Sequence, residues 1–208
     1  MYENLLPRFF SKDQLRPNLC GPNLEAGYVY GTDGHCLIRV PENKLIAPQE
    51  GWPIVPKIDY FKAVWPETLR MLDAPIQVNV DALAKAMESI GTHIVYEDCE
   101  KCGGDGQIDC PCCWQQMKCK TCDGSGQGKA VGTELNDDHN ISLGCGVYLA
   151  PRLAEHLVEC ALDIGEPIFM VTIPAARKGQ LFRTGEAEIL LMPRDYRTDK
   201  VIEMQFII

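Results

Sequence analysis

Seven of the eleven cysteines of this 208-residue chain lie in one stretch of thirty residues, positions 99–128. The pattern C-x-x-C-x-G-x-G occurs there twice, first at Cys99 and Cys102 and again at Cys119 and Cys122. Sixteen residues separate the two pairs, a spacing typical of zinc sites. The stretch has few apolar residues, so we expect a bound ion rather than a hydrophobic core to supply its folding energy.

A structural Zn²⁺ ion takes four ligands in a tetrahedron, with Zn–S distances of about 2.3 Å. Two residues between cysteines allow a tight turn to direct both thiolates at one ion, and the glycines that follow permit positive φ. We therefore predict that Zn²⁺ is the cofactor and that its ligands are Cys99, Cys102, Cys119 and Cys122. A disulfide-rich loop is the alternative, but nothing else in the sequence indicates an oxidising compartment.

Three more cysteines lie between these pairs, at Cys110, Cys112 and Cys113. Cys110 and Cys113 form a third C-x-x-C, which lacks the trailing glycines. Two interpretations are open. The three thiols hold a second zinc ion with a fourth ligand from elsewhere, or they lie at the tip of the zinc-binding hairpin as spare or alternative ligands.

The repeated cysteine pattern resembles the cysteine-rich region of the DnaJ-type co-chaperones, which pairs four such repeats around two zinc ions. This chain has two good copies and one degenerate copy, and it lacks the His-Pro-Asp signature of a J-domain. The resemblance covers residues 99–126 only. It implies metal binding and does not imply chaperone activity.

Outside this stretch, strand and helix patterns alternate. A strand at 76–80 is followed by a helix at 82–90, with Asp81 as the expected N-cap, and by a strand at 93–97 that leads into Cys99. A returning strand is expected at 129–135, so the cysteine stretch replaces the tip of a hairpin. A second unit follows, with a strand at 142–149, a helix at 151–163 that starts at Pro151, and strands at 168–173, 180–183, 187–192 and 201–208.

The N-terminal part is more irregular. Residues 27–40 predict a β-hairpin that turns at Asp33-Gly34. Residues 41–75 contain six prolines and predict an irregular connection, with a short strand near Ile54 and a helical turn near Tyr60. Because strands outnumber helices and adjoin through hairpins, we predict an α+β fold of duplicated strand–helix–strands units with mainly antiparallel sheets and an inserted zinc-binding hairpin.

Five segments, in the same order along the chain, resemble parts of the bacterial β sliding clamp, the β subunit of DNA polymerase III. They are TDGHCLIRV at 32–40, DYFKAVWP at 59–66, the strand and helix at 76–90, GVYLAPRLAEHLVECAL at 146–162 and AEILLMPR at 187–194. The resemblance implies a DNA-clamp fold, with paired helices lining a channel and sheets outside. It divides the chain into a partial clamp-like segment at 1–66 and a clamp-like domain at 67–208, interrupted by the zinc-binding insertion at 99–128.

The same resemblance implies a processivity factor without catalysis. The implied partners are duplex DNA, a DNA polymerase or another replication protein, and further copies of the chain. The net charge of −9 and the lack of a basic segment argue against a simple nucleic-acid-binding surface. They favour the alternative, a zinc-stabilised protein-interaction module that keeps the clamp-type fold without encircling DNA.

We expect neither catalytic residues nor a membrane partner. The histidines at His35, His93, His139 and His156 show no spacing with a nucleophile or a carboxylate pair, and four thiolates leave a zinc ion no open position for a water. No apolar run reaches ~18 residues, and the N-terminus has no apolar region typical of a signal peptide. We therefore expect a reducing, cytoplasmic location.

Overall fold

A computed structural model describes residues 2–45, 52, 70–144, 146–172, 179–193 and 200–203. The chain forms two compact units, one made of residues 1–89 and 137–208 and the other of residues 90–136. The sequence interpretations at 54–55, 59–66, 173 and 204–208 lie outside the described residues.

The first unit is built on a seven-stranded sheet in which every pairing is antiparallel. In sheet order its strands are β1 (Asn23–Glu25), β2 (Tyr28–Thr32), β3 (Cys36–Pro41), β13 (Ala187–Leu191), β12 (Gln180–Thr184), β11 (Phe169–Thr172) and β4 (Met71–Gln77). A smaller sheet pairs β10 (Tyr148–Leu149) antiparallel to β9 (Asn140–Ser142), which also pairs with β14 (Val201–Glu203) in parallel. The predicted α+β class with mainly antiparallel sheets is confirmed.

Strand register explains the core of this unit. Ile38, Ile189, Phe182 and Met170 lie directly opposite one another on successive strands, and all four are fully buried. Residues adjacent to these four, together with Tyr30 on β2, form a second buried group on the other face, made of Tyr30, Leu37, Val171, Leu181 and Leu190. Because successive side chains of a strand point to opposite faces, both faces of the central strands are buried.

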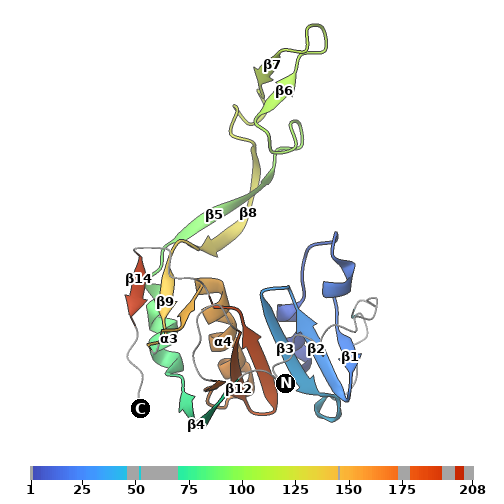
Figure 1. Cartoon of the computed structure of the whole chain (residues 1–208). Coiled ribbons are helices and arrows are strands. Elements are labelled where there is room, and N and C mark those ends of the chain that lie inside the picture. Colours follow the sequence, from blue (N-terminus) through green and yellow to red (C-terminus); the bar gives the residue numbers. More distant parts are fainter. Residues whose placement is uncertain are drawn as a thin grey trace. The chain divides into compact units, whose positions relative to one another are not determined.

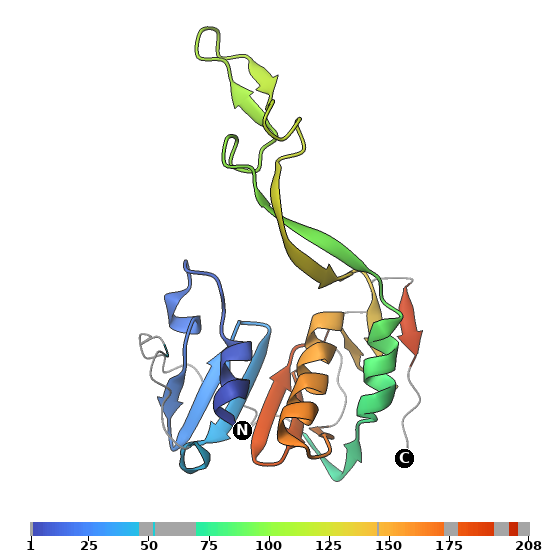
Figure 2. The same cartoon turned by 180° about the vertical axis from the view of Figure 1, so that it is seen from behind.

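Helices lie in a row on one side of the strands (Figure 2). The short helices α1 (Tyr2–Leu5) and η1 (Leu6–Phe9) come first, then α4 (Pro151–Ile164), then α3 (Val80–Glu88); α4 contacts both α1 and α3. Two further short helices are η2 (Pro17–Leu19) and η3 (Glu42–Lys44). Each predicted strand–helix unit thus contributes one of two adjacent helices.

Three local expectations need correction. The strand predicted at 76–80 is β4 at Met71–Gln77, which begins within the stretch predicted to be irregular, and α3 already starts at Val80. Asn79, not Asp81, is the N-cap of α3, because its side chain accepts a hydrogen bond of 2.9 Å from the backbone N–H of Ala82. Asp81 lies in the first helical turn, where its negative charge interacts favourably with the positive end of the helix dipole. The strand predicted at 142–149 is instead the hairpin β9–β10, which turns through Gly144 and Gly146, both at positive φ.

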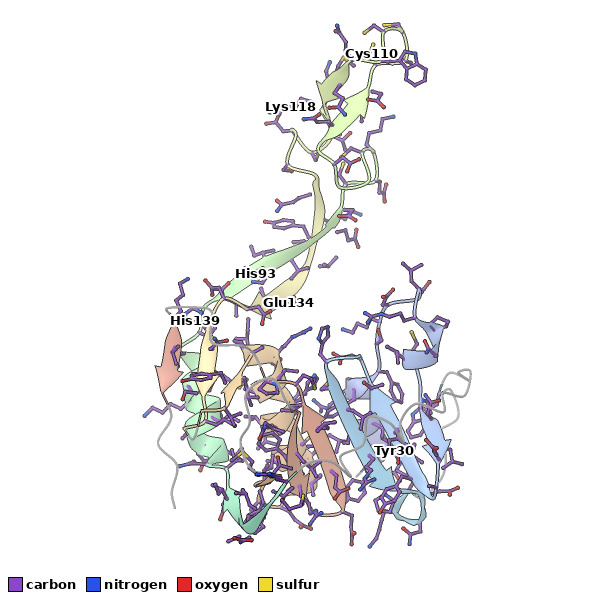
Figure 3. All side chains as sticks on the ribbon, viewed as in Figure 1. Tyr30, His93, Cys110, Lys118, Glu134 and His139 are labelled. Atoms are coloured by element: carbon purple, nitrogen blue, oxygen red, sulfur yellow. The ribbon has the colours of Figure 1, made fainter. Side chains whose placement is uncertain are left out.

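The second unit is a long hairpin (Figure 1). Strands β5 (Thr92–Asp98) and β8 (Gln127–Leu135) pair antiparallel, which confirms the strands predicted on either side of the cysteine stretch. Figure 3 shows His93 and Glu134, which lie directly opposite each other on this ribbon. Beyond the first cysteines, β6 (Gln107–Asp109) pairs with β7 (Gln116–Lys118) and carries the chain to its tip near Cys110.

Leu157 on α4 offers a test of this packing. Its side chain is fully buried, so Leu157→Ala should lower the free energy of unfolding by about 2–5 kcal/mol. Leu162→Ala, on the same helix, is the matched control, because Leu162 is 73% exposed and its truncation should change stability by less than about 0.5 kcal/mol. Urea denaturation followed by circular dichroism measures both, and equal losses would contradict this packing.

Candidate metal centre

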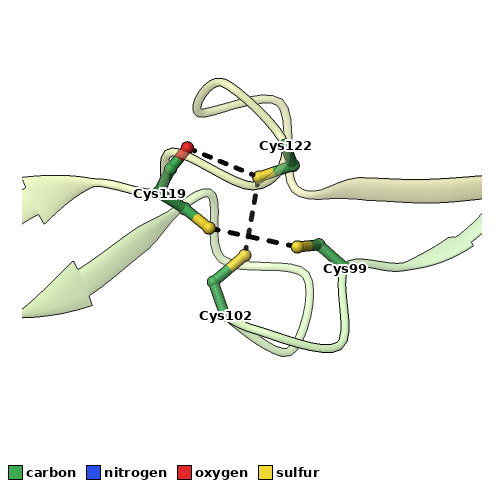
Figure 4. Close-up of side chains that lie close together, drawn as sticks. All are labelled: Cys99, Cys102, Cys119 and Cys122. Carbon is green, nitrogen blue, oxygen red and sulfur yellow. Dashed lines mark hydrogen bonds between the residues drawn. The ribbon is translucent and has the colours of Figure 1, made fainter.

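The four cysteines of the two C-x-x-C-x-G-x-G repeats come together where β5 ends and β8 begins (Figure 4). The Sγ atoms of Cys99 and Cys119 are 4.0 Å apart, and those of Cys102 and Cys122 are 3.7 Å apart. A tetrahedron of sulfurs with Zn–S bonds of about 2.3 Å has S–S edges of about 3.8 Å. The four thiols therefore fit a tetrahedral zinc ion.

The two repeats hold each other in place through reciprocal backbone hydrogen bonds. The N–H of Cys99 donates to the carbonyl of Gly126 at 2.7 Å, and the N–H of Cys119 donates to the carbonyl of Gly106 at 2.9 Å. Each loop thus fixes the first cysteine of the other. This pairing explains why a sequence repeat produces one site rather than two separate turns.

The second cysteine of each repeat accepts a hydrogen bond from its own loop. The N–H of Gly106 lies 3.2 Å from the Sγ of Cys102, and the N–H of Gly126 lies 3.3 Å from the Sγ of Cys122. Hydrogen bonds from N–H groups to sulfur favour the thiolate, which is the form that binds metal.

The glycines of the repeats are required by the close crossing of the two loops. A Cβ atom on Gly126 would lie 2.0 Å from the carbonyl oxygen of Gly104, and one on Gly106 would lie 2.4 Å from that of Gly124. All four glycines also have positive φ. No larger residue fits at this crossing without moving the backbone that carries the cysteines.

The thiols of the centre differ in acidity. The backbone N–H of Cys122 is the main cause that lowers the pKa of Cys119 to about 6. Burial raises the pKa of Cys102 to about 11. Thiols must lose their protons to bind zinc. The Cys102 thiol would therefore need the positive charge of the metal to ionise at neutral pH.

The other three cysteines of the stretch form a separate group at the tip of the β6–β7 hairpin. The ligand atoms of Cys110, Cys112 and Cys113 all lie within 4.8 Å of one another, and Cys112 and Cys113 are exposed. The strands β6 and β7 lie between this group and the four-cysteine centre, as Figure 3 shows for Cys110 and Lys118.

A third group of close polar side chains consists of Asp33, Cys36 and His156. The sequence pattern does not predict it. Asp33 Oδ1 accepts hydrogen bonds from the N–H of His35 at 2.7 Å and from the Sγ of Cys36 at 3.2 Å. Burial raises the pKa of Cys36, which favours the protonated thiol. His156 stacks on Phe9 with ring centroids 4.8 Å apart, and burial lowers its pKa. The group is explained as a hydrogen-bonded turn against α4, and no local spacing signals it.

His35 lies in the turn between β2 and β3, and His93 lies on β5. His139 lies next to Asp138, with its Nδ1 2.8 Å from a carboxylate oxygen, and Lys200 also pairs with Asp138. The structure does not bring these three histidines into the cysteine centre. Within the described ranges, no helix is both long enough and apolar enough to cross a membrane.

No protein-family model matches the chain. No curated protein matches it either. Among solved structures, the matches include DNA polymerase III beta subunits and sliding clamps. The beta subunit from Thermotoga maritima is 13% identical with a TM-score of 0.47, over 94% of this chain and 64% of that one.

The sliding clamp from Pseudomonas aeruginosa is 12% identical with a TM-score of 0.49, over 93% of this chain and 64% of that one. The clamp from Bacillus subtilis is 16% identical with a TM-score of 0.45, over 93% of this chain and 62% of that one. The chain thus spans less than two thirds of the length of these structures.

The crossing of the two loops can be tested with a pair of glycine variants. Gly126→Ala places a Cβ atom 2.0 Å from a carbonyl oxygen, and we expect it to lower zinc affinity by at least about a hundredfold. Gly103→Ala is the control, because Gly103 also has positive φ but a Cβ atom there would meet no other atom within 4 Å, and its effect should stay within about tenfold. Competition with a chromophoric zinc chelator measures both affinities. Equal losses would show that backbone strain, and not the crossing, makes these glycines necessary.

Metal content provides a second test. Protein purified under reducing conditions should contain about one zinc ion per chain at this centre. Cys99→Ser should abolish it, while Cys20→Ser, which removes a thiol of the first unit, should leave it unchanged. Elemental analysis together with hydrogen exchange of the β5–β8 ribbon provides the measurement. Wild-type protein without metal would exclude the zinc assignment.

Proposed function

We propose that this protein is a non-enzymatic, sliding-clamp-like accessory factor of DNA replication that carries a zinc-stabilised module. The observation that carries the proposal is the packing of α3 against α4, with one helix from each strand–helix unit and antiparallel strands on one side of them (Figure 2). In the clamp fold that the sequence resembles, such paired helices line the channel that surrounds duplex DNA.

The segments that carry the sequence resemblance support this proposal through the elements they form. TDGHCLIRV leads from the end of β2 through the turn into β3, and the segment at 76–90 contains the end of β4 and all of α3. The segment at 146–162 contains β10 and most of α4, and AEILLMPR begins with β13. The fifth segment, 59–66, lies outside the described residues.

We assign the zinc module a structural role. With four thiolate ligands, the ion would have no open position for water or substrate. The ion would hold the two loops together and so order the hairpin beyond them. The exposed tip of that hairpin is available to a partner protein.

One observation favours a second candidate, an interaction module that keeps the clamp-type fold without encircling DNA. The exposed charges of α3 include Asp81 and Glu88 beside Lys85. On the neighbouring helix α4, Glu159 and Asp163 pair with the Arg8 guanidinium of η1 at 2.6 Å and 3.1 Å. This helical layer lacks the excess of Lys and Arg from which most DNA affinity arises.

Oligomeric state and topology separate the two candidates. If the protein is a clamp, light scattering should show a discrete oligomer, because a closed ring contains a fixed number of copies. The oligomer should remain on nicked circular DNA in high salt and should leave when the circle is cut, because a ring is retained by topology and not by ionic contacts.

Protein–DNA complexes isolated by gel filtration before and after linearisation provide this measurement. A monomer that binds circular and linear DNA equally, or not at all, would exclude the clamp and favour the interaction module. Cys99→Ser should leave the oligomer intact, because Cys99 belongs to the second unit.

A further inference from the structure

The tip of the second unit has almost no apolar core. Strands β6 and β7 have three residues each, and of their side chains only Ile108 is partly buried. The loop between them is closed by two backbone hydrogen bonds of 2.9 Å, from Cys110 to Gln115 and from Trp114 to Cys110. A two-stranded hairpin of this size is marginal in water, so the tip needs an additional link to stay ordered.

Three thiols lie in the loop between β6 and β7, where an additional link would stabilise the tip. Cys110, Cys112 and Cys113 fall on four consecutive residues, and their ligand atoms lie within 4.8 Å of one another. Free cysteines are among the most buried residues in proteins, whereas Cys112 and Cys113 are exposed. Packing does not explain why Cys112 and Cys113 are exposed at the tip. The closeness of the three sulfur atoms is instead typical of a set of metal ligands.

The number of donors selects the ion. Among the described residues, this group contains three sulfurs and no fourth His, Cys, Asp or Glu ligand. Structural zinc is almost always four-coordinate, and the four-cysteine centre already offers it a complete site. Soft thiolates also select Cu(I), a monovalent ion that is satisfied by three of them.

We propose that Cys110, Cys112 and Cys113 form a second metal site, which binds one Cu(I) ion through three thiolates and fastens the tip of the hairpin. On binding, three S–H bonds are broken, three Cu–S bonds form and the protons pass to solvent; copper keeps its oxidation state. The site does not depend on the proposed role in DNA replication.

The geometry allows this with side-chain rotation alone. In trigonal-planar coordination, three sulfurs at about 2.3 Å from the ion are about 4.0 Å apart. The Sγ atoms of Cys110 and Cys112 are 2.9 Å apart, so this pair must open by about 1 Å. Cys112 and Cys113 are exposed, as is Trp114 at 80%, and they can turn without displacing a packed core.

The test uses the full chain loaded with zinc and kept under anaerobic, reducing conditions. Titration with Cu(I) against a chromophoric Cu(I) chelator should show about one copper ion bound per chain, with zinc retained. X-ray absorption at the copper edge should show three sulfur neighbours. The combined variant Cys110→Ser, Cys112→Ser, Cys113→Ser should lose the copper and keep the zinc, while Cys20→Ser should keep both.

Three outcomes would overturn the proposal. They are Cu(I) binding only with release of zinc, copper retained by the triple variant, and a second zinc ion that fills the tip with four ligands. Zinc content of the triple variant reports whether the rest of the module has folded. Since no DNA or oligomer enters the measurement, its failure is distinct from failure of the clamp proposal.

Discussion

The pairing of β3 with β13 is the contact on which the first unit depends. It joins residues 36–39 to residues 188–191, so the hairpin near the N-terminus becomes continuous with the C-terminal strands. Glu188 strengthens the junction, since its carboxylate lies 2.5 Å from the guanidinium of Arg39 on β3 and 2.6 Å from that of Arg183 on β12. Arg39 also lies over the ring of Tyr28, 4.4 Å from its centroid. One acidic residue thus links three neighbouring strands, and the sheet formed in this way carries the helical layer.

The second unit is held by a different kind of interaction. Most side chains of β5 and β8 are exposed, so burial of apolar surface contributes little to this ribbon. Its buried residues include Cys99, Cys119, Gly106 and Gly126, all at the crossing of the two loops. The free energy that orders this unit therefore comes from the strand ladder, from the reciprocal hydrogen bonds of the crossing and, in our proposal, from the metal. The two units differ in this respect, which is why the cysteine stretch tolerates so few apolar residues.

The features that were predictable from the sequence are those with a local cause. The C-x-x-C-x-G-x-G spacing encodes a turn and a donor set, so the four-cysteine group could be predicted, and the pattern of α4, with Pro151 at its start and Gly165 beyond its end, is equally local. The errors arise where two local solutions compete. Asn79 and Asp81 are both good N-cap residues, and only the end of β4 at Gln77 decides between them.

Contacts between distant residues had no local signal. The approach of His156 to Asp33 depends on how α4 packs, and the register that aligns Ile38 with Ile189 depends on the whole sheet. The charge of the helical layer was predictable only in part. The acidic residues of α4 are evident from the sequence, but their ion pairs with Arg8 are not. These ion pairs neutralise positive charge that would otherwise be available to bind DNA phosphates. In the clamp that we propose, closure around the duplex rather than ionic affinity would have to retain the protein on DNA, because this layer carries no excess of Lys and Arg.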